Sequence, residues 1–134
     1  AVNIVPTTTG AASATAEVIK GIGGKFDGMA LRVPTPCGSI SDFTFLTKKK
    51  VTVEQVNRAL TKAAQSKEMK GILEVTSEPI VSSDIIGNPH SAIVDLALTS
   101  VIDGDLLKVI AWYDNEWGYS NRLVEMAVLV GKSI

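Results

Sequence analysis

Ala111-Trp-Tyr-Asp-Asn-Glu-Trp-Gly-Tyr-Ser-Asn-Arg122 holds both tryptophans and both tyrosines of a chain in which only 5% of residues are aromatic. The stretch begins with the pattern of a strand and ends with that of a helix. Aromatic planes and amide groups at a strand-to-helix junction suit the recognition of a flat, polar, ring-bearing ligand. Trp112 and Tyr113 would lie on opposite faces of the strand, however, so at least one of these rings is expected to be buried packing.

The segments before this stretch have the pattern of strands, and the segment after it has the pattern of a helix. The turn Asp103-Gly104-Asp105 predicts a hairpin that joins two strands. A further strand and a last helix complete this half of the chain. The expected elements are strands over 72–76, 92–102 and 106–113 and a helix from about 116 to 132.

Towards the amino terminus the pattern predicts two helices and two strands. Thr52 and Gln55 have the spacing of a capping box, so the clearest helix of the chain should begin there. The other elements are a helix over 11–20 and strands over 26–33 and 39–47, which their short connection makes antiparallel neighbours. Because most strands are joined by turns, we expect an α+β fold, a mainly antiparallel sheet with helices packed on one face.

Composition excludes several classes of function. The 13 basic and 14 acidic side chains leave a net charge of -1, with no basic stripe for nucleic acid and no cationic face for a membrane. A single cysteine and the lack of a secretion signal favour a reducing, cytoplasmic setting. The 134 residues fit one compact domain. The chain starts inside an apolar run without a methionine, so we expect it to be cut from something longer.

Three positions could bind a polar ligand. Thr9 and Gly10 precede a helix, whose unpaired amides attract anions such as phosphate, although Thr9 could simply cap that helix. Arg32 lies among small residues on one strand face, where its guanidinium could grip phosphate or pair with a nearby acid. Asn115 matches a carboxamide ligand, but its spacing alone favours a role as the cap of the last helix.

The lone histidine and the lone cysteine are weaker candidates. His90 lies in a turn, with no cysteine or acid near it in sequence, and is interpreted as structural. Cys37 has neither a helix start nor a cation beside it to lower its pKa, so it is a poor nucleophile. No spacing of histidine, cysteine and carboxylate side chains indicates a metal site.

Four blocks of the sequence resemble the carboxy-terminal part of phosphorylating glyceraldehyde-3-phosphate dehydrogenase. They occur in the order of that family and extend over essentially the whole chain. The blocks are Pro6-Thr-Thr-Thr-Gly-Ala-Ala12, Met29-Ala-Leu-Arg-Val-Pro-Thr35, Pro89-His-Ser-Ala-Ile-Val-Asp95 and Trp112-Tyr-Asp-Asn-Glu-Trp-Gly-Tyr-Ser-Asn-Arg122. The resemblance implies part of a catalytic domain whose family oxidises glyceraldehyde 3-phosphate to 1,3-bisphosphoglycerate in glycolysis, through a cysteine thioester, with NAD as cofactor.

The resemblance also implies roles for particular residues. Thr9 and Gly10 match the residues that hold inorganic phosphate, and Arg32 matches the arginine that binds phosphate at the substrate sites. Asn115 matches the residue that hydrogen-bonds the nicotinamide carboxamide, and Tyr119 the ring that packs near it. Ser13 stands where the family commonly has a lysine, which implies a weaker positive field at the phosphate.

By the same resemblance the chain has no catalytic residue of its own. The nucleophilic cysteine of the family lies in a Ser-Cys-Thr-Thr-Asn segment followed by the base histidine, both expected upstream of this chain, together with the NAD-binding domain. We therefore expect residues 1–134 to be inactive alone and to act within a full-length subunit of a cytoplasmic homotetramer. The alternatives are a fragment of the sibling erythrose-4-phosphate dehydrogenase and a non-catalytic binding or assembly module.

Overall fold

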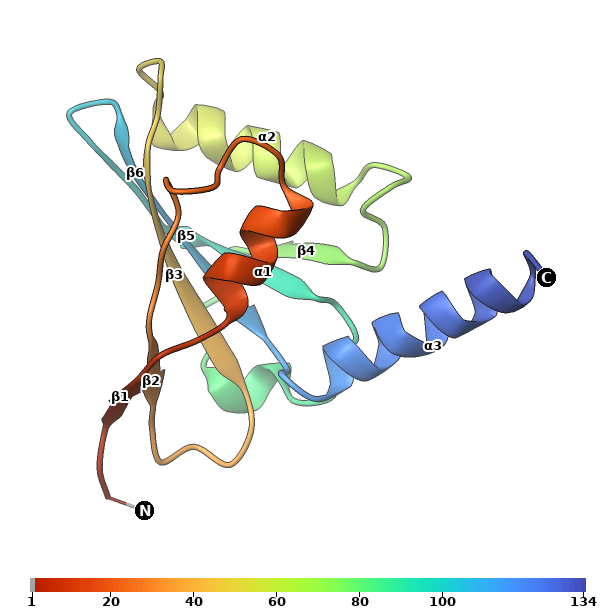
Figure 1. The fold of residues 1–134 in the computed structure, drawn as a ribbon. Coiled ribbons are helices and arrows are strands. Elements are labelled where there is room, and N and C mark those ends of the chain that lie inside the picture. The colour runs from red at the N-terminus through yellow and green to blue at the C-terminus, as the bar shows by residue number, and fades with distance from the viewer. Residues whose placement is uncertain (1) are drawn as a thin grey trace. The chain divides into compact units, whose positions relative to one another are not determined.

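A four-stranded sheet with one helix lying against it forms the larger part of the chain (Figure 1). The computed structural model describes residues 2–134, and these cluster into two units, one ending at Pro36 and one spanning Cys37–Ile134. Composition had suggested a single compact domain instead. Each unit is described by itself below.

The amino-terminal unit is a short strand pair with a helix between its strands. β1 (Val5–Thr7) pairs antiparallel with β2 (Ala30–Arg32), and α1 (Ala11–Val18) follows β1. A longer strand was expected over 26–33, but the strand found there, β2, is only three residues long. At the start of that range the Asp27 side chain accepts a hydrogen bond from the Gly28 amide at 2.8 Å, a local bond that competes with strand pairing.

The second unit contains the expected hairpin and the last helix. Its sheet has the order β3-β6-β5-β4, in which only the β4–β5 pair is parallel, and the predicted mainly antiparallel α+β class is confirmed. Its elements are β3 (Ser39–Leu46), α2 (Val53–Ala64), β4 (Leu73–Thr76), the 3-10 helix η1 (Ser82–Ile85), β5 (Ala92–Ile102), β6 (Leu106–Tyr113) and α3 (Trp117–Gly131).

One pairing inferred from a short connection is wrong. The strand around Arg32 pairs with β1, whereas β3 pairs with β6, with Ser39 opposite Tyr113. Pro34 and Pro36 separate the two strands, and proline cannot donate a ladder hydrogen bond. The partner of β3 therefore comes from far along the chain, and this pairing brings the start of β3 to the β6–α3 junction.

Two local predictions are confirmed in detail. The Thr52 hydroxyl accepts a hydrogen bond from the Gln55 amide at 3.3 Å, and the Gln55 side chain accepts one from the Thr52 amide at 3.0 Å. At the hairpin, the three residues 103–105 join β5 to β6, and Asp103 and Gly104 have positive φ angles of 49° and 78°, which tight turns between strands favour. Both features depend on residues close in sequence.

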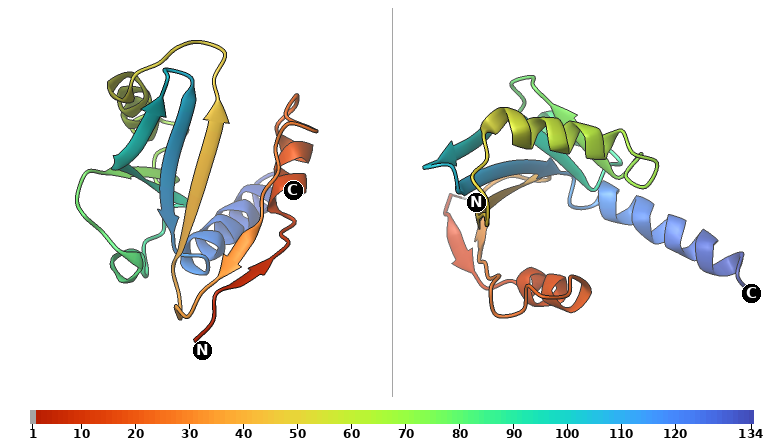
Figure 2. Two further views of the ribbon diagram at one scale, coloured as in Figure 1. Left: turned by 90° about the vertical axis from the view of Figure 1, so that its left-hand side faces the viewer. Right: turned by 90° about the horizontal axis from the view of Figure 1, so that it is seen from above.

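The core of this unit lies between the sheet and α2. Val94, Val109 and Ala111 are buried, and Val56 and Leu60 of α2 pack against them. Helix α3 instead extends away from the sheet (Figures 1 and 2). Its apolar side chains stay exposed, with 56% of Leu123 and 63% of Leu129 accessible to solvent.

Candidate functional site

The carboxylate of Asp114 caps α3 at the β6–α3 junction. Its Oδ1 accepts hydrogen bonds from the amides of Glu116 at 2.9 Å and Trp117 at 2.8 Å. Its Oδ2 accepts a third bond, at 2.8 Å, from the amide of Gly87 in the connection between β4 and β5. Only 4% of Asp114 is exposed. One buried side chain therefore fixes both the start of the helix and the loop beside it.

These hydrogen bonds also set the charge state of Asp114. The Trp117 amide, followed by the Gly87 amide, lowers the pKa of Asp114 from 3.8 to about 2, against the opposing effect of burial. Asp114 is therefore ionised at neutral pH, and its charge is matched by backbone donors.

Asn115 is not the helix cap that its position suggested. Its Oδ1 accepts a hydrogen bond from the Gly38 amide at 3.0 Å and one from the Ser39 hydroxyl at 3.2 Å. Asp114 takes the capping role, because its side chain is in reach of the first helical amides. The Asn115 side chain instead joins the junction to the start of β3 and remains exposed.

Two glycines allow the backbones around the junction to approach closely. A Cβ on Gly118 would lie 2.9 Å from the carbonyl oxygen of His90. A Cβ on Gly38, which has a φ of 94°, would lie 2.8 Å from the carbonyl oxygen of Ser82. A side chain at either position would therefore displace the backbone segment that lies against it.

The aromatic rings of the opening stretch divide into buried and exposed ones. Trp112 is half-buried, and its indole N–H donates to Asp95 at 3.2 Å, as expected for packing. Trp117 and Tyr119 are 52% and 70% exposed on the first turn of α3. Tyr119 lies in the first turn of the helix, four residues after Asn115, which precedes the helix.

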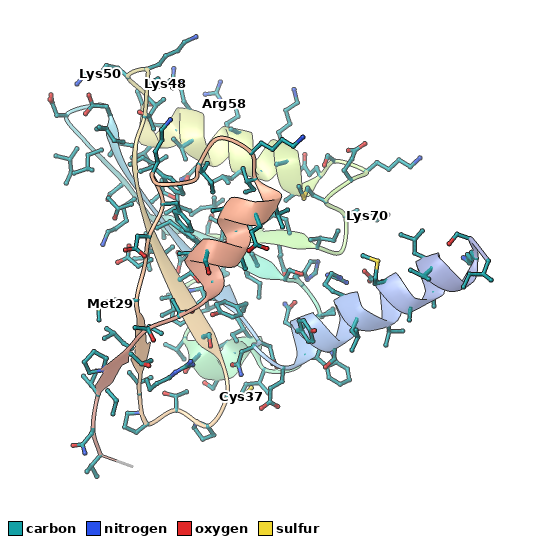
Figure 3. The ribbon with its side chains drawn as sticks, viewed as in Figure 1. Met29, Cys37, Lys48, Lys50, Arg58 and Lys70 are labelled. Atoms are coloured by element: carbon teal, nitrogen blue, oxygen red, sulfur yellow. The ribbon has the colours of Figure 1, made fainter. Side chains whose placement is uncertain are left out.

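Cys37 lies beside the same junction, in the loop before β3 (Figure 3). Burial raises the pKa of its thiol, and the hydrogen bond from Sγ to Asp114 Oδ1 at 3.5 Å raises it further. The protonated thiol is a poor nucleophile, in agreement with the sequence-based interpretation.

His90 has the acidic partner that sequence alone did not reveal. Its Nδ1 lies 3.1 Å from a carboxylate oxygen of Glu74 and 2.8 Å from Oδ1 of Asn88. The Asn88 amide also donates to Glu74 at 2.8 Å. The ring therefore belongs to a local polar cluster at the β4–β5 connection.

In the amino-terminal unit, Thr9 and Gly10 lie at the start of α1. The Thr9 hydroxyl oxygen accepts a hydrogen bond from the Ala11 amide at 3.2 Å, although Gly10 occupies the N-cap position of the helix. The amides of Gly10, Ala12 and Ser13 have no acceptor among residues 2–134. This helix start can still offer N–H donors to an anion.

Arg32 ends β2 in the same unit and is exposed. Within the described part of the chain it forms neither an ion pair nor a side-chain hydrogen bond, so the alternative of a salt bridge finds no support. Arg32 pairs across the ladder with Val5, before the end of β1, whereas Thr9 and Gly10 follow that strand. The structure therefore places the guanidinium and the helix start in one unit without direct contact.

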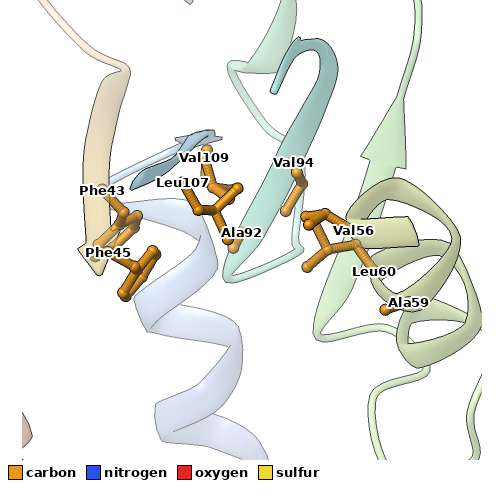
Figure 4. A pocket seen from close by; sticks show the side chains of 10 residues that line it. Phe43, Phe45, Val56, Ala59, Leu60, Ala92, Val94, Leu107 and Val109 are labelled. Carbon is orange, nitrogen blue, oxygen red and sulfur yellow. The ribbon is translucent and has the colours of Figure 1, made fainter. Parts of the chain in front are cut away.

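An apolar pocket lies elsewhere, on the face of the sheet that α2 partly covers (Figure 4). Phe43 and Phe45 stack at its rim, with ring centres 5.9 Å apart. No polar side chain lines it, so it lacks the groups that orient a polar ligand.

In residues 2–134, no three histidine, cysteine or acidic side chains converge on a point where a metal could bind. None of the helices described here has the length and apolar character needed to cross a bilayer.

Several residues that build the site were not recognised from the sequence. Asp114 and Ser39 are two of them, and Arg122 is a third, since its guanidinium donates to the carbonyl of Gly71 at 3.0 Å and to the Ser91 hydroxyl at 3.3 Å. An aspartate three residues before Trp117 is a capping signal that could have identified Asp114. The contacts of Ser39 and Arg122 join segments far apart in sequence, so no local pattern could have indicated them.

The larger unit has an α+β fold and presents the side-chain amide of Asn115, with exposed rings on the helix that follows. The amino-terminal unit presents the start of α1 and an exposed arginine. Comparison with known proteins adds the family. The sequence profile described as "Glyceraldehyde 3-phosphate dehydrogenase, C-terminal domain" matches residues 1–115. The chain therefore belongs to the glyceraldehyde-3-phosphate dehydrogenase family, as part of its carboxy-terminal domain.

Individual relatives agree with this assignment. The chain is 56% identical over its whole length to glyceraldehyde-3-phosphate dehydrogenase of Mycobacterium avium. It is 54% identical over its whole length to the Mycobacterium tuberculosis protein of that name, and 52% identical over 98% of its length to glyceraldehyde-3-phosphate dehydrogenase 2 of Streptomyces avermitilis. In each case it spans only 39% of the relative's own length.

We expect Asp114→Asn to destabilise the fold in a pH-dependent way. Because the folded-state pKa is lowered, the charge of Asp114 stabilises fully above pH 3.8, and this stabilisation is lost as the pH falls through about 2. Urea unfolding near neutral pH should show a loss of about 1–3 kcal/mol in the free energy of unfolding, shrinking towards zero at acid pH. Glu116→Gln is the control, since within residues 2–134 that exposed carboxylate accepts no hydrogen bond. A loss that does not change with pH would contradict this account.

Proposed function

We propose that this chain supplies the phosphate and nicotinamide contacts of an NAD-dependent, phosphorylating glyceraldehyde-3-phosphate dehydrogenase. The reaction oxidises the aldehyde of glyceraldehyde 3-phosphate and transfers inorganic phosphate to the resulting acyl group, giving 1,3-bisphosphoglycerate. The observation that carries the proposal is the 54–56% identity, over the whole chain, to relatives with this name.

The amino-terminal unit contributes groups for anionic oxygens. Thr9 and Gly10 lie where α1 offers amides without an acceptor in the described part of the chain, and these can hold the attacking inorganic phosphate. Arg32 is exposed, and its forked guanidinium can bind a phosphate group at the substrate sites. Both groups act by binding and orienting, which brings reacting atoms together without any covalent role for this chain.

The second unit contributes groups that fit a nicotinamide. Asn115 exposes amide N–H donors, which can hydrogen-bond a carboxamide, and the exposed ring of Tyr119 can pack near the flat nicotinamide. When bound, NAD accepts the hydride that leaves the aldehyde carbon. Asn115 then fixes which face of the ring is presented to that carbon.

The remaining parts of the enzyme belong, in this proposal, to the rest of the same subunit. These are the nucleophilic cysteine, the base histidine and the NAD-binding domain, and the subunit works as a cytoplasmic homotetramer. Cys37 does not replace the nucleophile, because burial and Asp114 raise the pKa of its thiol. His90 belongs to a separate polar cluster, in which its Nδ1 is held by Glu74 and Asn88 at the β4–β5 connection.

The 134-residue chain alone should not turn over substrate. We expect no NADH absorbance when the purified chain is mixed with NAD, glyceraldehyde 3-phosphate and phosphate, because the nucleophile is missing. Circular dichroism confirms that the chain is folded in the same solution, and a complete enzyme of the family is the positive control. Clear NADH formation would refute the assignment of the nucleophile to another part of the subunit.

Substitutions of Arg32 and Asn115 in the full-length subunit should have opposite effects. Arg32→Ala should raise the KM for substrate or phosphate about 10- to 100-fold and leave the Kd of NAD nearly unchanged, since a charge-assisted contact is lost. Asn115→Ala should raise the Kd of NAD about fivefold with little change in the phosphate KM. Arg32→Lys is the control, because lysine keeps the positive charge but lacks the planar guanidinium that can form two parallel hydrogen bonds. An equal loss of NAD affinity in Arg32→Ala would count against the assignment.

A further inference from the structure

Both lone pairs of the Asn115 amide oxygen are already used within the protein. The Gly38 amide and the Ser39 hydroxyl donate to Oδ1 at 3.0 and 3.2 Å. An amide oxygen accepts two hydrogen bonds, whereas the amide nitrogen carries two donors. Nδ2 has no acceptor among residues 2–134, and Asn115 is exposed. The side chain can therefore offer a ligand donors only.

The orientation of this amide follows from its partners. The oxygen and nitrogen of an asparagine amide are assigned from their hydrogen bonds, and a backbone N–H can only donate. The Gly38 N–H therefore requires Oδ1, and not Nδ2, on its side. A hydroxyl can donate or accept, so the Ser39 hydroxyl alone would not decide the orientation of the amide. With Oδ1 placed by the Gly38 N–H, the Ser39 hydroxyl donates to the same oxygen.

We propose that Ser39 is a positioning residue for the cofactor contact of Asn115. Its hydroxyl holds Oδ1 towards β3, so that Nδ2 faces outward and donates to the carbonyl oxygen of the nicotinamide carboxamide. This inference rests on the proposed function, in which Asn115 binds the nicotinamide. Ser39 itself does not touch the cofactor.

The place of Ser39 in the fold makes it a rigid support. It is the first residue of β3, half-buried, and pairs with Tyr113 of β6, two residues before Asn115. On the preceding side, the Cys37 thiol donates to Asp114 Oδ1 at 3.5 Å. The start of β3 is thus tied to the residues on both sides of the junction, so the hydroxyl and the amide are held before any ligand binds.

The test compares four variants of the full-length subunit. Ser39→Ala removes the hydroxyl, Ser39→Thr keeps it, and Asn115→Ala removes the amide. Ser41→Ala is the matched control, since Ser41 lies on the same strand, is half-buried and makes no side-chain hydrogen bond among residues 2–134. The readouts are the Kd of NAD by fluorescence titration, the KM of the aldehyde and the melting temperature.

We expect Ser39→Ala to raise the Kd of NAD about fivefold and to leave the KM of the aldehyde unchanged. The melting temperature should stay within a few degrees of that of the parent protein. Ser39→Thr and Ser41→Ala should stay within about twofold of the parent Kd. In the Asn115→Ala background, Ser39→Ala should add nothing, because its effect acts through that amide. A purely structural role would lower the melting temperature and leave the Kd unchanged.

The outcomes separate this inference from the proposed function. If Asn115→Ala weakens NAD binding but Ser39→Ala behaves like Ser41→Ala, Ser39 does not position the amide, and only the inference is overturned. If Asn115→Ala leaves the Kd of NAD unchanged, the proposed nicotinamide contact is wrong, and the inference is lost with it. A further loss of affinity in the double variant would also overturn the inference.

A second measurement needs no change at Ser39. The acetylpyridine analogue of NAD keeps the carbonyl oxygen but has a methyl group in place of the amide nitrogen. Since Asn115 offers donors only, Asn115→Ala should weaken NAD and this analogue by the same factor. If the variant weakens NAD but leaves the analogue unaffected, Oδ1 is the group that contacts the cofactor, and the inference is overturned.

Discussion

The carboxylate of Asp114 accepts hydrogen bonds from three backbone amides that belong to two segments far apart in sequence. It is buried and ionised, and its charge is balanced by those amides rather than by a cation. The next residue, Asn115, bonds to the start of β3 instead of to the helix amides, which Asp114 already binds. The backbone from which the exposed amide projects is thus held by this one carboxylate.

The two units offer complementary chemistry. The first presents amides at the start of α1 and the guanidinium of Arg32, none of which has a partner among residues 2–134, and both suit phosphate oxygens. The second presents the donors of Asn115, which suit a carboxamide oxygen. In the proposed function all of these groups bind and orient, and none of them attacks a carbonyl carbon. This fits a chain that spans 39% of the length of its relatives and belongs to the carboxy-terminal domain of their family.

The sequence predicted those features that depend on neighbouring residues. The Thr52 capping box and the Asp103-Gly104 hairpin are local, and both are present. The pairing of β3 with β6 and the parallel β4–β5 pair depend on distant residues, so spacing alone could not indicate them. The same reason explains the site: Asn115 was recognised as a binding candidate, but its bonds to the start of β3 and the capping by Asp114 appear only in three dimensions.

The central claim is that the β6–α3 junction presents the Asn115 amide nitrogen to the nicotinamide carboxamide, with its oxygen held by the start of β3. A crystal structure of the full-length subunit with NAD tests this claim most directly. We expect Nδ2 within about 3 Å of the carboxamide oxygen, with Oδ1 still accepting from Gly38 and Ser39. A nicotinamide ring bound away from Asn115, or an amide turned so that Oδ1 faces the cofactor, would contradict the account.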